Sequence, residues 1–171
     1  MDDKRGAILA ELPRLRRYAR ALMRDRDSAD DLVQDCIEKA LAKLDNWQTG
    51  DNPRRWLFTI MHHVFIDQLR KVKRRGETVP IGTQQEAAFV TQPTQLETLQ
   101  AREVLDALQA IDPDRRSALV LVAVEGLTYS EAATVLGIPA GTLMSRIARG
   151  REDLRAQLED ASRRRKIRVV E

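Results

Sequence analysis

The sequence is poor in the residues that build disulfide-bonded, metal-binding or membrane-spanning proteins. Its 171 residues include a single cysteine, Cys36, so no internal disulfide and no cysteine-based metal site can form. Aromatic residues make up only 4%, which disfavours a sandwich of aromatic-rich β-strands. No apolar run approaches the length of a membrane span, and no charged-then-apolar leader is present. These absences predict a protein of the reducing cytoplasm without membrane insertion.

Patterns of catalytic residues are missing as well. The sequence contains no nucleophile paired with a base, no phosphate-binding loop and no metal-ligand cluster, so it predicts neither an enzyme nor a bound cofactor. The adjacent His62 and His63 would diverge by about 100° on a helix and could not easily chelate one metal. We interpret them as surface histidines.

Helical periodicity dominates what is present, and it predicts an all-α fold of two small helical domains. Residues 1–75 and 96–171 carry apolar stripes at three- and four-residue steps. Residues 76–95 between them are rich in Gly, Pro, Thr and Gln and have no helical period, which predicts a flexible linker.

The clearest local pattern runs from Thr128 to Arg151. Thr128 and Glu131 can form a capping box at the start of a short helix, Gly137 can end that helix, and Pro139 suits the first turn of the next. Two helices joined by a Gly-containing turn indicate a helix-turn-helix with an arginine-bearing recognition helix. The alternative is an ordinary helical hairpin whose arginines are only solvated.

An acidic face is predicted near the N-terminus, on a helix for which Ser28 is a candidate N-cap. Opposite the apolar side of this helix lie Asp30, Asp31, Gln34, Asp35 and Glu38. Such a charge run is either a solvated surface or a binding surface. It would repel DNA, and it therefore suits a basic protein partner better.

The loop DNWQTGDN places one large aromatic, Trp47, among turn-forming residues. Trp47 either folds back onto the core or is available for stacking. Asn52 and Pro53 then open a long helix that ends in a basic cluster able to meet a phosphate backbone. Its outer face is predicted to carry Arg54, Arg55, Thr59, His62, His63 and Asp67.

Taken together, three motifs resemble the extracytoplasmic-function (ECF) group of bacterial RNA polymerase sigma factors, which belong to the sigma-70 family. They are ADDLVQDCIEKAL, NPRRWLFTIMHHVFIDQLRKVKRR and GLTYSEAATVLGIPAGTLMSRIARGREDLR, in the family's order and divided by a linker of the family's kind. The resemblance covers nearly the whole chain. It implies a subunit that directs core RNA polymerase to promoters, helps to open the duplex and is controlled by an anti-sigma factor.

The resemblance also assigns roles to particular residues. The surface that binds the coiled coil of the polymerase's largest subunit would comprise Asp30, Asp31, Leu32, Val33, Gln34 and Asp35. The minus-ten promoter element would be bound by Trp47, Arg54, Arg55, Thr59, His62 and His63, with Trp47 stacking on an unpaired base. The minus-thirty-five element would be bound by Thr142, Met144, Ser145, Arg146 and Arg149.

Two positions depart from the family's pattern. His63 stands where many members carry Asn, and Met144 stands where the family often has a basic residue.

Two other functions also fit parts of the chain. A conventional helix-turn-helix regulator would bind duplex DNA alone, as a dimer. An anti-sigma mimic would engage polymerase through the acidic helix without reading DNA.

Overall fold

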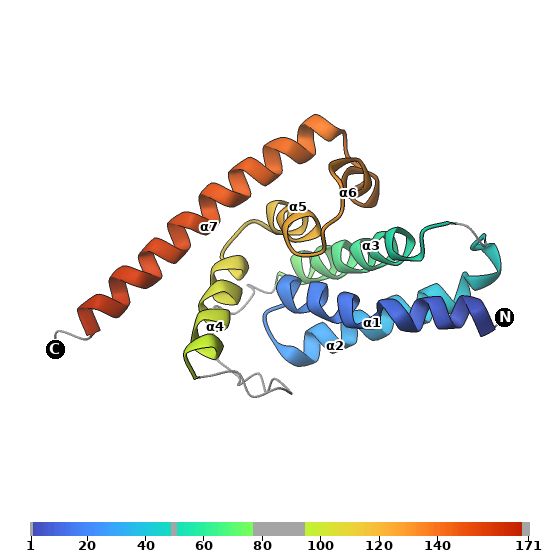
Figure 1. The fold of residues 1–171 in the computed structure, drawn as a ribbon, viewed down its shortest axis with the longest axis horizontal. Helices are drawn as coiled ribbons and strands as arrows, with labels where there is room; N and C mark the ends of the chain where they lie inside the picture. Colours follow the sequence, from blue (N-terminus) through green and yellow to red (C-terminus); the bar gives the residue numbers. More distant parts are fainter. Residues whose placement is uncertain (1, 49–50, 77–94, 169–171) are drawn as a thin grey trace.

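The computed structural model describes residues 2–48, 51–76 and 95–168, and this part of the chain forms helices without any β-strand. Figure 1 shows their arrangement. In chain order the helices are α1 (Asp2–Leu22), α2 (Arg26–Ala42), the short 3-10 helix η1 (Leu44–Asn46), α3 (Pro53–Arg74), α4 (Gln95–Gln109), α5 (Pro113–Ala123), α6 (Tyr129–Leu136) and α7 (Ala140–Arg168). The prediction of an all-α fold is confirmed.

The first three helices pack together around an apolar core. Tyr18 of α1 meets Phe58 of α3 edge to face, with ring centroids 5.2 Å apart. Burying each large apolar side chain of this kind contributes about 1.5–3 kcal/mol. The largest completely buried side chains of this bundle are Leu15, Tyr18, Leu22, Leu32, Leu57, Phe58, Met61 and Phe65.

Helix α2 begins earlier than its predicted cap. Asp25, not Ser28, occupies the N-cap position: its Oδ1 accepts from the Ser28 backbone N–H at 2.8 Å, and its Oδ2 accepts from the Ser28 hydroxyl at 2.8 Å. These hydrogen bonds, the backbone one above all, lower the pKa of Asp25. The prediction for Ser28 was wrong because a carboxylate is a stronger acceptor than a hydroxyl, and Ser28 lies in the first turn as its donor.

In the second half of the chain, α5 is the central helix. Asp112 caps it by accepting from the backbone N–H groups of Asp114 and Arg115, and Pro113 occupies the first turn. Helix α7 crosses α5 at Gly150, where an added Cβ would lie 3.3 Å from the carbonyl oxygen of Arg115. A glycine at this position therefore allows the two helix backbones to approach closely.

The two halves lie against one another in the structure. Helix α1 contacts α4 and α5, and α3 contacts α6, which places the second half beside the first bundle (Figure 1). Buried apolar side chains of both halves belong to one continuous cluster. The predicted linker, apart from its end residues 76 and 95, lies outside the described residues, and the boundaries 1–75 and 96–171 stay a prediction.

Candidate functional site

The helix-turn-helix is formed by α6 and the first part of α7. The Thr128 hydroxyl accepts from the Glu131 backbone N–H at 3.2 Å, and the Glu131 carboxylate accepts from the Thr128 backbone N–H at 2.8 Å. This is the predicted capping box. Gly137 ends α6 with a φ of 63°, in the left-handed region that favours glycine. The carbonyl of Pro139 then accepts the first hydrogen bond of α7, from Leu143.

One face of the early part of α7 is open. Thr142, Ser145 and Arg149 are exposed and follow each other at three- and four-residue steps, so they share this face. Within the described part of the chain, the Arg149 guanidinium forms neither a hydrogen bond nor an ion pair. These are the side chains that could reach DNA without any rearrangement.

The other two residues predicted for this surface are placed differently. Arg146 donates from Nη2 to Asp114 Oδ2 at 2.9 Å, and its side chain is 26% exposed. Met144 is 53% exposed, but it stands two residues from Thr142 and therefore about 200° around the helix. The predicted set thus divides into three open residues, one ion-paired arginine and one methionine on another side.

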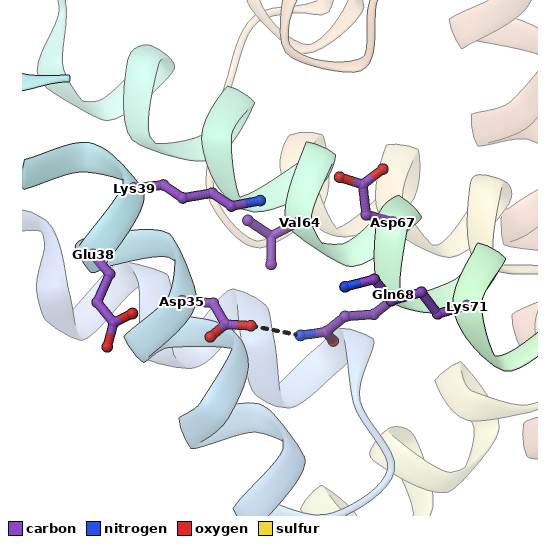
Figure 2. A pocket seen from close by; sticks show the side chains of 7 residues that line it. All are labelled: Asp35, Glu38, Lys39, Val64, Asp67, Gln68 and Lys71. Atoms are coloured by element: carbon purple, nitrogen blue, oxygen red, sulfur yellow. Dashed lines mark hydrogen bonds between the residues drawn. The ribbon is translucent and has the colours of Figure 1, made fainter. Parts of the chain in front are cut away.

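The acidic face of α2 is exposed at Asp30, Asp31, Gln34 and Asp35. Helix α3 adds to it, because Gln68 donates to Asp35 Oδ2 at 3.1 Å beside a groove of about 190 Å³ that Asp67 also lines (Figure 2). Leu32 is completely buried and Val33 is 7% exposed. In this structure Leu32 supports the acidic face from beneath and has no surface to offer to a partner.

A second groove, of about 530 Å³, lies between α1 and α2, and sequence reasoning missed it. Leu12, Val33 and Ile37 provide its apolar lining, while its charged lining comes from Arg16, Arg20, Arg26, Asp30 and Glu38. Ile37 belongs to the apolar side of α2 but is only half-buried, and Leu41, which lies outside the groove, is 46% exposed. This groove adjoins the acidic face and extends the surface open to a protein partner.

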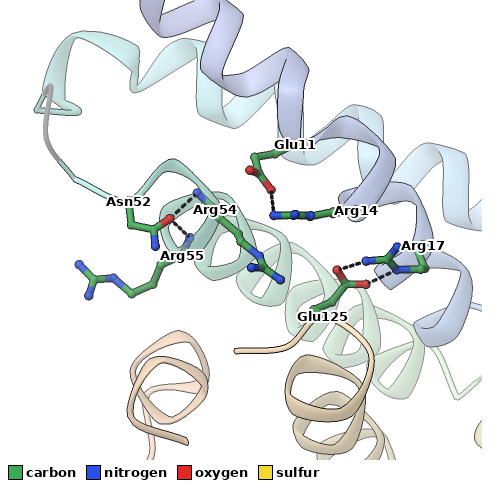
Figure 3. Close-up of polar contacts among 7 residues, drawn as sticks. All are labelled: Glu11, Arg14, Arg17, Asn52, Arg54, Arg55 and Glu125. Atoms are coloured by element: carbon green, nitrogen blue, oxygen red, sulfur yellow. Dashed lines mark hydrogen bonds and ion pairs between the residues drawn. The ribbon is translucent and has the colours of Figure 1, made fainter. Parts of the chain in front are cut away.

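The start of α3 is fixed by its cap. Asn52 Oδ1 accepts from the backbone N–H groups of Arg54 and Arg55 at 3.0 and 3.4 Å (Figure 3). From there the predicted minus-ten residues form two stripes at four-residue steps. Arg55 and His63 of the outer stripe are exposed, and Thr59 between them is half-buried. The inner stripe consists of Arg54 and His62, on either side of buried Phe58.

His62 is not a surface histidine, which corrects the interpretation from sequence. It is 7% exposed, and its Nδ1 has no hydrogen-bond partner among the described residues. Burial lowers the pKa of His62 to about 4; His63 and Arg146 act in the same direction, and Asp114 opposes them. Periodicity on α3 could not reveal that the second half of the chain covers this side.

Trp47 is folded back. It is 6% exposed and stacks on Trp56, with ring centroids 5.5 Å apart and an interplanar angle of 17°. Lys4 of α1 holds the loop by donating to the carbonyls of Leu44 and Trp47 at 3.2 and 2.6 Å. The ring is therefore not open to a base in this structure, and its stacking role stays a prediction that requires release of the loop.

These surfaces define an all-helical DNA-binding protein in which a helix-turn-helix is joined to a bundle with an exposed acidic face. The described residues contain no group of three or more His, Cys, Asp or Glu side chains that could hold a metal ion. No described helix combines the length and apolar character needed to cross a membrane.

Comparison with known proteins gives the family. Residues 8–62 match the family model of the Sigma2 domain of PhyR, and residues 101–154 match that of Sigma-70, region 4. The chain is 40% identical over 157 residues to the ECF RNA polymerase sigma factor EcfG of Rhodopseudomonas palustris, spanning 92% of this chain and 86% of that protein. It is 34% identical over 139 residues to the ECF RNA polymerase sigma factor SigC of Mycobacterium tuberculosis, spanning 81% and 75%.

Among solved structures, the sigma factor RpoE in its complex with the anti-sigma factor NepR from Bartonella quintana is similar, with a TM-score of 0.77. The two sequences are 33% identical, and the match covers 93% of this chain and 98% of that one. The chain belongs to the ECF sigma factors of RNA polymerase. The resemblance noted from sequence is confirmed, and members of this family are initiation factors rather than enzymes.

Proposed function

We propose that this chain directs core RNA polymerase to specific promoters and assists duplex opening during transcription initiation. The observation that carries the proposal is that one chain of the ECF family presents two surfaces of opposite character. The open face of α7 suits DNA, whereas the exposed acidic face of α2 would repel it. A basic protein surface complements that acidic face, and the family resemblance names the coiled coil of the polymerase's largest subunit.

The residue roles follow from the two surfaces. Arg149, with Thr142 and Ser145, would contact base edges and phosphates of the minus-thirty-five element in the major groove. The outer stripe of α3, carrying Arg55, Thr59 and His63, would meet the opened minus-ten element. Residues Arg54, His62, Trp47 and Arg146 would join these contacts only after rearrangement.

An anti-sigma factor is the proposed regulator. RpoE of Bartonella quintana, which matches this chain along most of its length, was solved bound to the anti-sigma factor NepR. A partner of that kind would cover the polymerase- and DNA-binding surfaces until a signal releases it. We place the activity in the cytoplasm, where polymerase and promoter DNA are found.

Transcription with purified core polymerase tests the proposal. Adding the protein to core enzyme and a promoter library should produce transcripts with defined start sites, and start sites no more specific than those of core enzyme alone would contradict it. Tight binding of a palindromic duplex by a dimer, without polymerase, would instead favour a conventional regulator.

The polymerase contact has its own test in a pull-down without DNA. Reversing the charges of Asp31 and Asp35 to Arg should weaken association while leaving the helical circular dichroism spectrum unchanged. The matched control reverses the charges of Glu159 and Asp160 to Arg. Both residues are exposed on the distal part of α7, and their substitution changes the net charge by the same amount. Equal retention of both variants by core polymerase would refute the role of the acidic face.

A further inference from the structure

The exposed surface on the early part of α7 is wider than the row formed by Thr142, Ser145 and Arg149. Met144 is 53% exposed, a large fraction for an apolar side chain, and Ala148, one turn later, is exposed as well. Four residues apart on a helix, these two side chains are neighbours. An apolar patch therefore lies beside the polar residues that we propose to contact DNA.

The five exposed side chains form one continuous surface, because each residue of a helix is rotated by about 100° from the one before it. Around the helix axis the order is Met144, Ala148, Ser145, Arg149 and Thr142, in steps of about 20° to 60°. Together they cover about 160° of the circumference. Met144 and Thr142 stand at its two edges, and Ala148 joins Met144 to the polar row.

The opposite side of α7 is fixed to the protein. Leu143 and Ile147 are 0% and 2% exposed, where α7 packs on α5 and α6. Arg146 adds a hydrogen-bonded ion pair to Asp114 of α5 at 2.9 Å. These contacts set the rotation of α7 about its own axis. The exposure of Met144 and Ala148 thus follows from the way in which the helix-turn-helix is built.

The residue types on this segment limit the bases that it can read. Residues 140–150, AGTLMSRIARG, contain no Asn, Gln, Asp or Glu. In the major groove, Asn or Gln binds adenine through paired hydrogen bonds, a carboxylate accepts from cytosine, and arginine binds guanine. Arg149 can therefore read a G·C pair, whereas the usual partners of adenine are missing. The apolar feature that marks an A·T pair in this groove is the 5-methyl group of thymine.

The hydroxyl of Ser145 does not supply the missing readout. It donates to the Gly141 carbonyl at 3.1 Å, which leaves its oxygen as an acceptor. An acceptor can bind the amino group of adenine or that of cytosine, so it does not distinguish the two bases. The identity of an A·T pair is left to an apolar contact, and the apolar patch adjoins this serine.

We propose that Met144, with Ala148 beside it, recognises thymine through its 5-methyl group in the upstream promoter element. A methionine side chain is flexible and polarisable, so its thioether end can pack closely on a methyl group. The short side chain of Ala148 leaves room for the edge of the base. Met144 takes this role only if the minus-thirty-five element is the ligand of α7, so the proposal rests on the proposed function.

Deoxyuridine tests the proposal, because it lacks the methyl group of thymine and keeps all of its hydrogen-bonding groups. The full chain with core polymerase first selects a promoter from a random library. That promoter is then synthesised in two forms, with thymine or with deoxyuridine throughout both strands of the upstream element alone. The two forms compete for one holoenzyme. Wild type should prefer the thymine form by about fourfold for each methyl group that it buries.

Substitutions at the same position separate the methyl contact from other effects. Met144→Ala should reduce the preference for the thymine form to less than about twofold, whereas Met144→Leu, which keeps a large apolar side chain, should retain it. Arg149→Ala should weaken the binding of both forms and leave the ratio between them unchanged. Circular dichroism should show equal helix content in all three variants, because Met144 and Arg149 are exposed.

Three results would overturn the inference. They are a selected upstream element without any A·T pair, a wild type that binds the two forms equally, and a preference for thymine that survives in Met144→Ala. In the last two cases, equal weakening of both forms by Met144→Ala would assign the methionine to a contact other than the methyl group.

The proposed function fails in a different way. If the library yields no promoter, the proposed function is wrong and the inference falls with it. If a promoter is selected and bound without a preference for thymine, only the inference is wrong.

Discussion

The buried imidazole of His62 should make stability fall between pH 7.5 and 5.5. In the folded protein burial lowers the pKa of His62 to about 4, from an ordinary value of 6.5. The unfolded chain therefore takes up the proton first as pH falls, and the contribution of neutral His62 to stability, complete above pH 6.5, is lost on the way down to about 4. At pH 5.5, one unit below the ordinary pKa, the loss is about 1.4 kcal/mol.

This magnitude depends little on the folded-state pKa, because pH 5.5 lies well above it. Urea unfolding at pH 7.5 and 5.5, followed by circular dichroism, measures the difference. The variant His62→Gln should lose the pH-dependent part, whereas His63→Gln should keep it, because the neighbouring His63 is exposed. Carboxylates with lowered pKa, such as that of Asp25, lose their contribution only at lower pH. An undiminished fall of about 1.4 kcal/mol in His62→Gln would refute the reasoning.

Three further predictions concern the helix-turn-helix and its support. Thr128→Ala should lower the free energy of unfolding by about 1 kcal/mol through loss of the capping box, and Thr128→Ser should restore most of it. Gly150→Val should destabilise by about 1–3 kcal/mol, because its side chain meets the Arg115 backbone, whereas Gly6→Ala, on an open part of α1, should stabilise by up to about 1 kcal/mol in the same urea titration. Arg149→Ala should cost about 1–3 kcal/mol of discrimination between promoters in binding competition, and Arg151→Ala should leave the preference unchanged.

Local signals in the sequence were enough to predict several of the helix boundaries. Thr128 with Glu131, Gly137, and Asn52 with Pro53 each act through hydrogen bonds or backbone angles within a few residues. Whether these residues begin or end a helix does not depend on the rest of the fold. The wrong cap at Ser28 is a near miss of the same kind, since a stronger acceptor stands three residues earlier.

The placement of the candidate site was harder to predict, because it depends on which faces meet. The pattern on α3 separates a core side from an outer side, but it does not say that the second half of the chain covers His62. Trp47 presented two physically reasonable positions, and stacking on Trp56 together with hydrogen bonds from Lys4 decides between them in this structure. Glu125 gave no local signal, because the partner of its carboxylate stands 108 positions away.

Arginine illustrates why composition alone says little about binding here. Arg17 is held by a buried carboxylate, Arg116 is buried against helix carbonyls, and Arg146 is paired with Asp114. By contrast, Arg149 is exposed and forms no ion pair within the described part of the chain. The structure therefore offers DNA fewer arginines than the sequence contains, because these three guanidinium groups are already bound to groups of the protein itself.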